Sequence, residues 1–360
     1  DKLGEIVGGA TPSTKCEDYY GGSIPWITPK DLSSFKGRYI TSGERNITEK
    51  GLASCSAQMM PKDAVLFTSR APIGYVAIAS QSVCTNQGFK SIVVNEKADP
   101  LFVYYLLKYN KDAIEAMGSG TTFKEVSGKT MRAVKVRIPL DVSYQKRIAA
   151  VLDSLDTKIE NNERINDNLQ QQAQAIYSSM FIDNPDPAWS HGHLSDLITV
   201  KYGKDHKKLA DGIYPVYGSG GIMRYVERPL YNKESVLIPR KGTLNNVMYV
   251  NQPFWSVDTM FYTEMKLPNV AKFVYHFVKA KDLASMNAGS AVPSMTTDIL
   301  NAMEVVIPSA SALEEFESLV APMYEAMEAN DVQSKALSQI RDTLLPKLMS
   351  GEIDVSDVQL

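Results

Sequence analysis

Two stretches of this chain carry mostly apolar residues at alternating spacings of four and three, and the second stretch repeats the first. Ile148 and Phe316 are 168 residues apart, and so are Ile176 and Leu344. The seam positions are Ile148, Leu152, Leu155, Ile159, Asn162, Leu169 and Ile176 in the first stretch, and Phe316, Val320, Met323, Met327, Asn330, Leu337 and Leu344 in the second. This spacing predicts two long helices whose seams pair as a coiled coil rather than packing on a globular core.

The residues in front of each helical stretch repeat as well. Gly120 lies nineteen residues before Pro139, Gly289 lies nineteen residues before Pro308, and each proline ends an apolar run that favours a strand. A repeat of roughly 170 residues indicates a duplicated unit. We predict a mixed α/β fold with two domains in a pseudo-twofold repeat, joined and separated by two long antiparallel coiled-coil helices. The expected domains are residues 1–142 and 184–309, and the expected helices are residues 143–183 and 310–360.

Two polar features of the predicted helices need an explanation. Asn162 and Asn330 occupy the middle positions of the two seams. A polar pair in a seam fixes register and orientation, so we expect these two side chains to face each other. Pro322 lies inside the second seam, so that helix either begins there or is kinked there.

The loops of the two copies differ sharply in length and sequence. A shared scaffold with unlike loops predicts that the two domains recognise two different targets. A helix of about 29 residues spans roughly 43 Å at about 1.5 Å per residue. This length is slightly more than one turn of B-DNA, about 34–36 Å, so two such domains are suited to two separate half-sites on one duplex.

Charge and composition exclude some classes of protein. The net charge is −3, so any nucleic-acid site must come from the local arrangement of charge. No apolar run is long enough to span a bilayer. The cysteines Cys16, Cys55 and Cys84 have no Cys-x-x-Cys spacing and leave one unpaired, which favours a reducing cytoplasm. Because residue 1 is Asp rather than Met, we expect the numbering to be trimmed at the N-terminus.

Several short motifs resemble parts of catalytic sites but lack residues that the chemistry needs. Residues 183–187, Asp-Asn-Pro-Asp-Pro, lack the second adjacent proline and the aromatic residue of the adenine methyltransferase motif, so we interpret them as a linker. Residues 128–130, Gly-Lys-Thr, follow Phe123 where a phosphate-binding loop requires glycine. His191 and His193 have no further Cys or His ligand nearby. We therefore predict no catalytic residue, no metal site and no cofactor in this chain.

Basic and polar residues in the loops are the better candidates for a binding site. Phosphate contacts need Lys or Arg, and base reading needs Arg, Lys, Asn or Gln in a groove. The densest basic run of the chain is residues 201–208. The candidate DNA-binding residues are Lys30, Lys36, Arg38, Arg70, Gln87 and Lys90 in the first domain, and Lys201, Lys204, His206, Lys207, Lys208, Arg224, Arg240, Lys241, Asn245 and Asn246 in the second.

Motifs across essentially the whole chain resemble one known family. Residues 138–159, which include Ile138-Pro139-Leu140 and Gln145-Lys146-Arg147-Ile148, resemble the central conserved region of type I restriction–modification specificity subunits. Residues 344–353 resemble the C-terminal conserved region of that family. Residues 24–27 and 69–74 resemble the start and middle of its target-recognition domains.

The resemblance implies a division of labour between subunits. Each domain would read one half of a bipartite DNA site, and the helices would set the gap and dock two modification subunits. Those partners would methylate adenine with S-adenosylmethionine and recruit ATP- and Mg-dependent restriction subunits, so this chain would itself be no enzyme. Two alternatives are a methyltransferase or nuclease with its own recognition domains, and a coiled-coil interaction protein without a role on DNA.

Overall fold

The computed structural model describes residues 2–70, 72–120, 124–286 and 294–358. Gly289, one of the glycines that mark the repeat, lies outside these residues. The chain forms two compact units: unit 1 comprises Asp1–Glu163 and Asp331–Leu360, and unit 2 comprises Arg164–Asn330. Each unit therefore contains one α/β domain, part of the long helix α6 (Val142–Ser178) and part of the long helix α10 (Ala310–Ser350).

The described strands of unit 1 form two sheets, of orders β1-β8-β5-β6-β3 and β4-β2-β7. Its helix α3 begins where the Asp99 side chain accepts a hydrogen bond from the Phe102 N–H and Pro100 occupies the first turn. The strands are β1 (Gly4–Gly8), β2 (Tyr20–Ile27), β3 (Tyr39–Ile40), β4 (Asn46–Ile47), β5 (Val65–Phe67), β6 (Val76–Ala79), β7 (Cys84–Thr85) and β8 (Lys90–Val94). The helices are α1 (Pro29–Ser33), α2 (Glu49–Ala53), α3 (Pro100–Tyr109), α4 (Lys111–Ala116) and α5 (Gly128–Ala133), with a 3-10 turn at Glu17–Tyr19.

Unit 2 repeats the plan of these two sheets except for the edge strand β3. Its sheets have the orders β10-β16-β13-β14 and β12-β11-β15, which match β1-β8-β5-β6 and β4-β2-β7, so the predicted duplication is confirmed. A third sheet, β17-β9, has no counterpart among the described strands of unit 1. The strands are β9 (Ser190–His193), β10 (Ile198–Tyr202), β11 (Asp211–Gly218), β12 (Gly221–Val226), β13 (Ser235–Pro239), β14 (Met248–Val250), β15 (Trp255–Ser256), β16 (Met260–Met265) and β17 (Glu304–Ile307). The helices are α7 (Leu194–Leu197), α8 (Ala271–Lys279) and α9 (Thr297–Asn301), and α6 continues as a π-helix at Ser179–Asp183.

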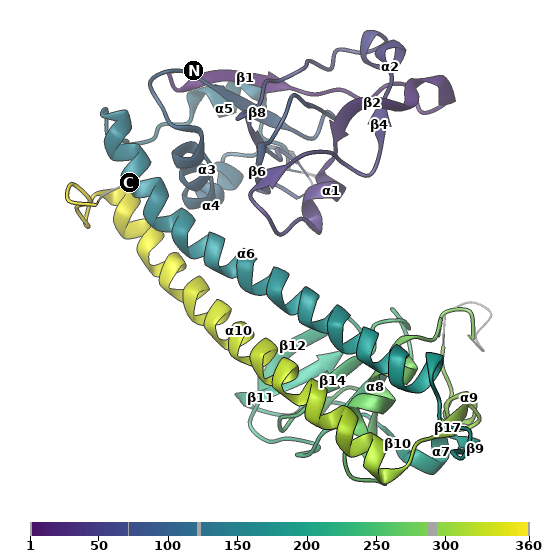
Figure 1. The fold of residues 1–360 in the computed structure, drawn as a ribbon. Helices are drawn as coiled ribbons and strands as arrows, with labels where there is room; N and C mark the ends of the chain where they lie inside the picture. The colour runs from purple at the N-terminus through teal and green to yellow at the C-terminus, as the bar shows by residue number, and fades with distance from the viewer. Residues whose placement is uncertain (1, 71, 121–123, 287–293, 359–360) are drawn as a thin grey trace. The chain divides into compact units, whose positions relative to one another are not determined.

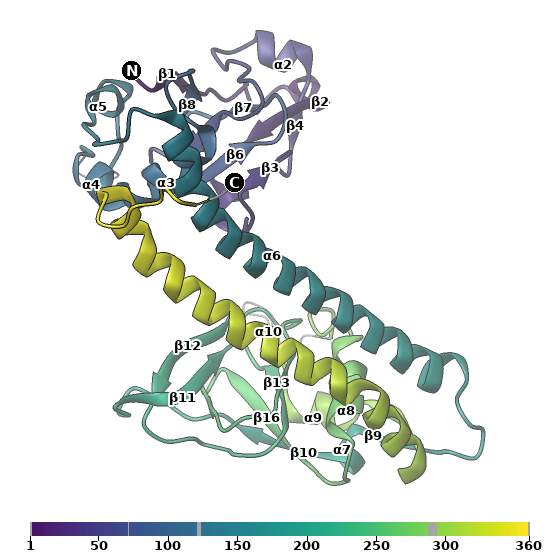
Figure 2. The same cartoon turned by 60° about the vertical axis from the view of Figure 1, so that its left-hand side comes forward.

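The ends of the two seams lie in globular cores. In unit 1, Ile148 and Leu152 of α6 pack with Phe102 of α3, which lies between the sheet and α6 (Figure 1). In unit 2, Phe316 and Val320 of α10 pack with α8 (Figure 2). The prediction of a pure coiled-coil seam was therefore wrong at these positions, because the same spacing also serves a helix that packs on a domain.

Polar seam residues join the two helices within each unit. In unit 1, the Asn162 side chain donates to Gln333 Oε1 (2.9 Å) and Ser334 Oγ (3.1 Å). In unit 2, Asn330 Nδ2 donates to Asn166 Oδ1 at 2.8 Å. As the residue number on α6 increases, the residue number of its partner on α10 decreases. The two helices therefore pair antiparallel, as predicted. Asn162 and Asn330 belong to different units, and their direct pairing stays a prediction.

Pro322 lies inside α10, which begins twelve residues earlier at Ala310. A helix start at Pro322, one of the two predicted possibilities, is therefore wrong. Proline removes one backbone donor from a helix interior, and the burial of Val320 and Tyr324 in the core of unit 2 stabilises the helix on both sides of this position.

Buried polar residues at equivalent positions attach each domain to the helices. In unit 1, the Tyr105 hydroxyl of α3 donates to Asp156 Oδ2 at 2.7 Å, and Arg341 of α10 donates to Asp156 Oδ1 at 2.6 Å. In unit 2, His276 of α8 occupies the position of Tyr105 and contacts Gln174 of α6 (2.8 Å) and the Tyr324 hydroxyl of α10 (3.0 Å). Burial lowers the pKa of His276 to about 4, so this imidazole is neutral at pH 7.

Candidate nucleic-acid interface

The loop after β10 presents the densest cluster of exposed cations in the predicted binding run. Lys204, Lys207 and Lys208 are exposed and form no ion pair within the described residues. The backbone of this loop is held in place, because Lys204 N donates to Ser256 O and Trp255 Nε1 donates to Lys204 O, both at 2.8 Å. The cluster is thus a fixed loop with free ammonium groups, which is the arrangement that phosphate binding needs.

A second basic loop of unit 2, which contains Arg240 and Lys241, is hydrogen-bonded to the same turn as the lysine-rich loop, at residues 256–260. Arg240 and Lys241 follow β13, and their backbone N–H groups donate to Thr259 O at 2.8 Å and 3.1 Å. The Arg240 guanidinium lies over the Tyr202 ring, 5.6 Å from its centroid. Because Gly203 N also donates to Met260 O, residues 256–260 bring both loops to the same end of the sheet.

Unit 1 has the same arrangement with different side chains. The turn at residues 85–89 accepts hydrogen bonds from Ala10 N (to Thr85 O, 3.0 Å) and from Ser69 N (to Gly88 O, 2.7 Å). Gln87 lies at the tip of this turn, is exposed, and accepts a hydrogen bond from the Thr11 hydroxyl. Arg70 and Lys90 both lie beside Glu125, at 3.8 Å and 3.7 Å. Equivalent turns therefore bring together Gln87, Arg70 and Lys90 in unit 1, and Lys204, Arg240 and Lys241 in unit 2.

Arg38 does not belong to the candidate set. Its side chain is only 6% exposed, and it donates to Asp153 O (3.0 Å), Thr157 Oγ1 (2.9 Å) and Glu160 Oε2 (3.0 Å) of α6. All three contacts hold unit 1 on its own segment of α6. The prediction that Arg38 contacts DNA is corrected, because a guanidinium with this burial has no access to a phosphate.

The remaining candidates, apart from His206, have partners on their own unit. Lys30 pairs with Glu44 at 2.7 Å and Lys36 lies 3.8 Å from Glu163, both at exposed sites where an ion pair contributes little. The other pairs are Lys201 with Glu264 (3.6 Å), Arg224 with Asp211 (2.8 Å), Asn245 with Asp282 (3.0 Å) and Asn246 with Ser219 O (2.8 Å). His206 is half-buried in the lysine-rich loop, and Nδ1 of its ring has no hydrogen-bond partner within the described residues.

Tyr202 is a site residue that sequence reasoning missed. It is 52% exposed and lies under Arg240 at the end of β10. An exposed aromatic ring beside basic residues can stack on a base or hold a guanidinium in place. Its position directly before the basic loop was the available signal.

Comparison with known proteins shows which family this chain belongs to. The family described as "Type I restriction modification DNA specificity domain" matches residues 1–171 and 188–316, which is most of the chain and includes both domains. The chain belongs to this family. The type I restriction enzyme MjaIX specificity subunit of Methanocaldococcus jannaschii is 33% identical over 402 residues, covering 99% of this chain and 93% of the relative. The EcoprrI specificity subunit of Escherichia coli is 22% identical over 356 residues, covering 90% of this chain and 88% of the relative.

A solved structure supports the fold. The crystal structure of the type I restriction–modification S subunit from M. genitalium matches with a TM-score of 0.62 at 18% identity, covering 96% of this chain and 94% of that chain. The mixed α/β fold with two repeated domains and two long helices is therefore confirmed. Membership of a DNA-specificity family also sets aside the alternative of a methyltransferase or nuclease with its own recognition domains.

Two further kinds of feature bear on the function of this chain, namely clusters of metal-binding side chains and membrane-spanning helices. No group of three or more His, Cys, Asp or Glu residues is positioned to hold a metal ion in the described part of the chain. The same residues contain no helix with the length and apolar character that a membrane span requires. Cys16, Cys55 and Cys84 are free thiols.

Proposed function

We propose that this specificity subunit directs a modification complex to a bipartite DNA site. Residues 1–142 and 184–309 each read one half-site, and the helices at residues 143–183 and 310–360 set the gap between them. The observation that supports this most is the pair of matching sheets that end in unlike loops. Gln87, Arg70 and Lys90 in one unit, and Lys204, Arg240 and Lys241 in the other, present different donors and acceptors at equivalent turns.

The partners are two modification subunits docked on the helices, with restriction subunits joining through them. S-adenosylmethionine, ATP and Mg belong to those partners. The complex works in the cytoplasm, which suits a chain with three free thiols. The side chains of the two turns position the DNA, and the chemistry at adenine takes place in the modification subunits.

A map of methylated adenines tests this function directly. Cells that express this chain with its modification subunits are compared with cells that lack only this chain. We expect one bipartite motif, with two unlike halves around a fixed gap, to disappear from the second map. An unchanged map would mean that the domains do not direct methylation, and a coiled-coil interaction protein would then be the better description.

Charge reversal in the lysine-rich loop is expected to weaken duplex binding. In the complex with modification subunits, the triple change Lys204→Glu, Lys207→Glu and Lys208→Glu should lower affinity at least about tenfold at physiological salt. Because each lost phosphate contact reduces the slope of log K against log salt by about 0.9, the slope should fall by up to about three. Affinity is measured by fluorescence anisotropy over a salt series.

A matched control carries the same change of net charge elsewhere. Lys50, Lys62 and Lys233 are exposed and lie outside the two turns, so their reversal to Glu should leave the salt slope close to that of the unchanged protein. Equal slopes for the two triple variants would show that the loop makes no phosphate contacts.

A further inference from the structure

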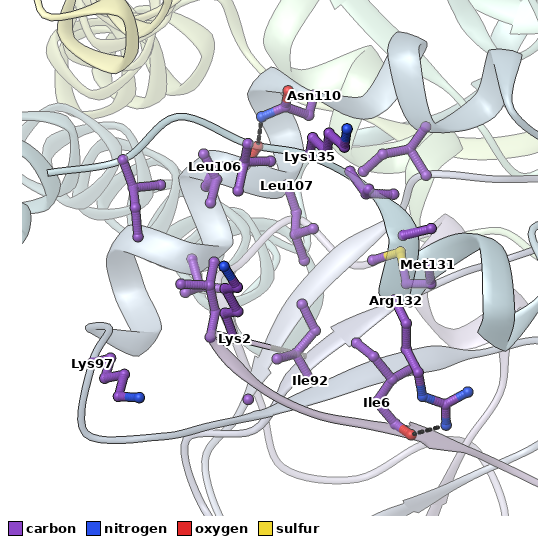
Figure 3. Close-up of a pocket in the computed structure, with 18 of the residues that line it drawn as sticks. Lys2, Ile6, Ile92, Lys97, Leu106, Leu107, Asn110, Met131, Arg132 and Lys135 are labelled. Atoms are coloured by element: carbon purple, nitrogen blue, oxygen red, sulfur yellow. Dashed lines mark hydrogen bonds between the residues drawn. The ribbon is translucent and has the colours of Figure 1, made fainter. Parts of the chain in front are cut away.

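Two apolar features of the molecule lie outside the set of candidate DNA-binding residues. One is a cavity of about 1230 Å³ in unit 1, among β1, β8, α3 and α5 (Figure 3). Its apolar lining residues, such as Ile6, Ile92 and Met131, are buried in the core, so they are out of reach of a macromolecular partner. The other is the hairpin of β11 and β12 in unit 2, which exposes the apolar side chains of Ile213, Ile222, Met223 and Tyr225.

The tip of this hairpin presents two neighbouring apolar side chains. Its loop consists of Ser219 and Gly220 only, and just after the loop β12 contains a β-bulge in which Met223 is the extra residue. In a regular strand, successive side chains point to opposite faces of the sheet, and a bulge breaks this alternation. Ile222 and Met223 are therefore exposed together, at 43% and 60%.

The hairpin tip lies at the same end of unit 2 as the two basic loops. Val257 N donates to Tyr217 O at 3.1 Å, so the strand that leads to the tip is bonded to the turn at residues 256–260. The same turn holds both basic loops. A Cβ on Gly218 would lie 2.5 Å from Met223 Sδ and 3.8 Å from a methyl group of Val257, which places the Met223 side chain beside this turn.

A second contact fixes the tip against the loop that carries Arg240 and Lys241. Asn246 Nδ2, near the end of that loop, donates to Ser219 O at 2.8 Å. A Cβ on Gly242 would lie only 2.7 Å from Ser219 Oγ, so the absence of a side chain at Gly242 lets the loop approach the tip. The cations of the two basic loops and the apolar tip are therefore held together at one end of unit 2.

Unit 1 has a different element at this place. Asn86 N donates to Ile27 O at 3.0 Å. This bond matches the one between Val257 and Tyr217, so Ile27 is the equivalent of Tyr217. Beyond Ile27 the chain enters the short helix α1 (Pro29–Ser33) rather than a two-residue hairpin loop. The apolar tip thus belongs to unit 2, and so does any base preference that it gives.

DNA offers one apolar group that suits such a tip. The major groove is about 12 Å wide and admits a two-stranded β-ribbon, and the C5-methyl group of thymine is the apolar group that base pairs present there. Exposed cations beside the tip suit the phosphates that flank the groove. We propose that the hairpin tip of unit 2 enters the major groove of its half-site, where Ile222 and Met223 contact thymine methyl groups. This inference rests on the proposed function and adds two specificity-determining residues to it.

Replacing thymine with deoxyuridine tests the contact, because it removes only the methyl group and keeps the base pair. The complex with modification subunits is titrated with the duplex that methylation mapping identifies, and with duplexes that carry deoxyuridine for every thymine of one half-site at a time. We expect the complex to bind about fourfold more weakly for each contacted methyl group that is lost, which is the effect of burying one methyl-sized group. Fluorescence anisotropy measures the affinities.

Two variants of the hairpin separate its tip from its other end. The double change Ile222→Ala and Met223→Ala should make the complex bind the thymine and deoxyuridine duplexes equally at one half-site, which is thereby assigned to unit 2. The matched control is Ile213→Ala, which removes a side chain that is 77% exposed at the opposite end of the same hairpin. This control should discriminate between the two duplexes as the unchanged protein does.

Two outcomes would overturn the proposal. One is an unchanged complex that binds the thymine and deoxyuridine duplexes equally, and the other is a double variant that retains the full methyl effect at both half-sites. In both outcomes the complex still prefers its own duplex to a scrambled one, so the proposed function would stand. A complex without that preference would overturn the proposed function, and this inference with it.

Discussion

The change Arg38→Ala is expected to destabilise unit 1 by about 3 kcal/mol. Arg38 is buried and faces two carboxylates of α6, 3.2 Å from Asp153 Oδ1 and 3.0 Å from Glu160 Oε2. These two groups hold the pKa of Arg38 above its usual value in spite of its burial. Burial already raises the pKa of Asp153 and of Glu160, so removing the guanidinium leaves two poorly solvated carboxylates without their counter-ion.

Hydrogen exchange at the amides of β5 and β8 measures this loss, because those strands belong to the core of unit 1. Lys36→Ala is the matched control: Lys36 is two residues away, exposed, and 3.8 Å from Glu163, so its removal should cost less than about 0.5 kcal/mol. Arg38→Lys should be intermediate, since a single ammonium cannot reproduce the three directed contacts of the guanidinium. An Arg38→Ala protein as stable as the Lys36→Ala control would refute the anchoring role.

Arg38 and Lys36 also show where sequence reasoning about a binding site stops. Both are basic residues in one polar stretch, and nothing local separates them. Their difference depends on Asp153, Thr157 and Glu160, which lie more than a hundred residues further along the chain. Pairings of that kind arise only when the domain packs on the helix, so a loop cation and a buried anchor look alike in sequence.

The helices were the more predictable part of the fold, because their signal is local and periodic. The spacing from Ile148 to Ile176 predicted a helix, and α6 begins at Val142 and ends at Ser178. The same spacing could not separate a coiled-coil position from a core position. Ile148 and Leu152 pack against α3, while Asn162 contacts Ser334 of α10. Both kinds of contact use one face of the helix, so both give the same spacing in the sequence.

The order of the strands in the sheets could not be predicted from the sequence, for a different reason. The repeat predicted that both domains share one plan, but β1 pairs with β8 and not with its neighbours along the chain. Such pairing depends on packing between residues far apart in the chain, and it produces no periodic pattern in the sequence. The clustering of Arg240, Lys241 and the lysine-rich loop follows from this topology, since residues 256–260 bring the two loops together.

Lengthening both helices by one heptad is expected to change the DNA target while leaving each half-site as it was. Two hydrogen-bonded pairs give the register of the helices: Asn162 with Ser334, and Asn166 with Asn330. In both pairs the residue numbers have the same sum, as in a regular antiparallel pair. Residues 163–169 of α6 therefore match residues 327–333 of α10. Duplicating both segments preserves the antiparallel register and the polar seam positions. Seven residues add about 10 Å to a helix, and one base pair spans about 3.4 Å, so the gap should grow by up to about three base pairs.

Methylation mapping of cells that carry the lengthened chain reads out the new gap and both half-sites at once. The matched control duplicates residues 163–169 alone. The unpaired insertion shifts α6 by a heptad against α10, so its polar and apolar seam positions no longer meet their partners, and we expect methylation at every bipartite motif to be lost. Altered bases within either half-site of the doubly lengthened protein would contradict the role of the helices as a spacer, because a spacer changes distance and leaves the loops that contact bases untouched.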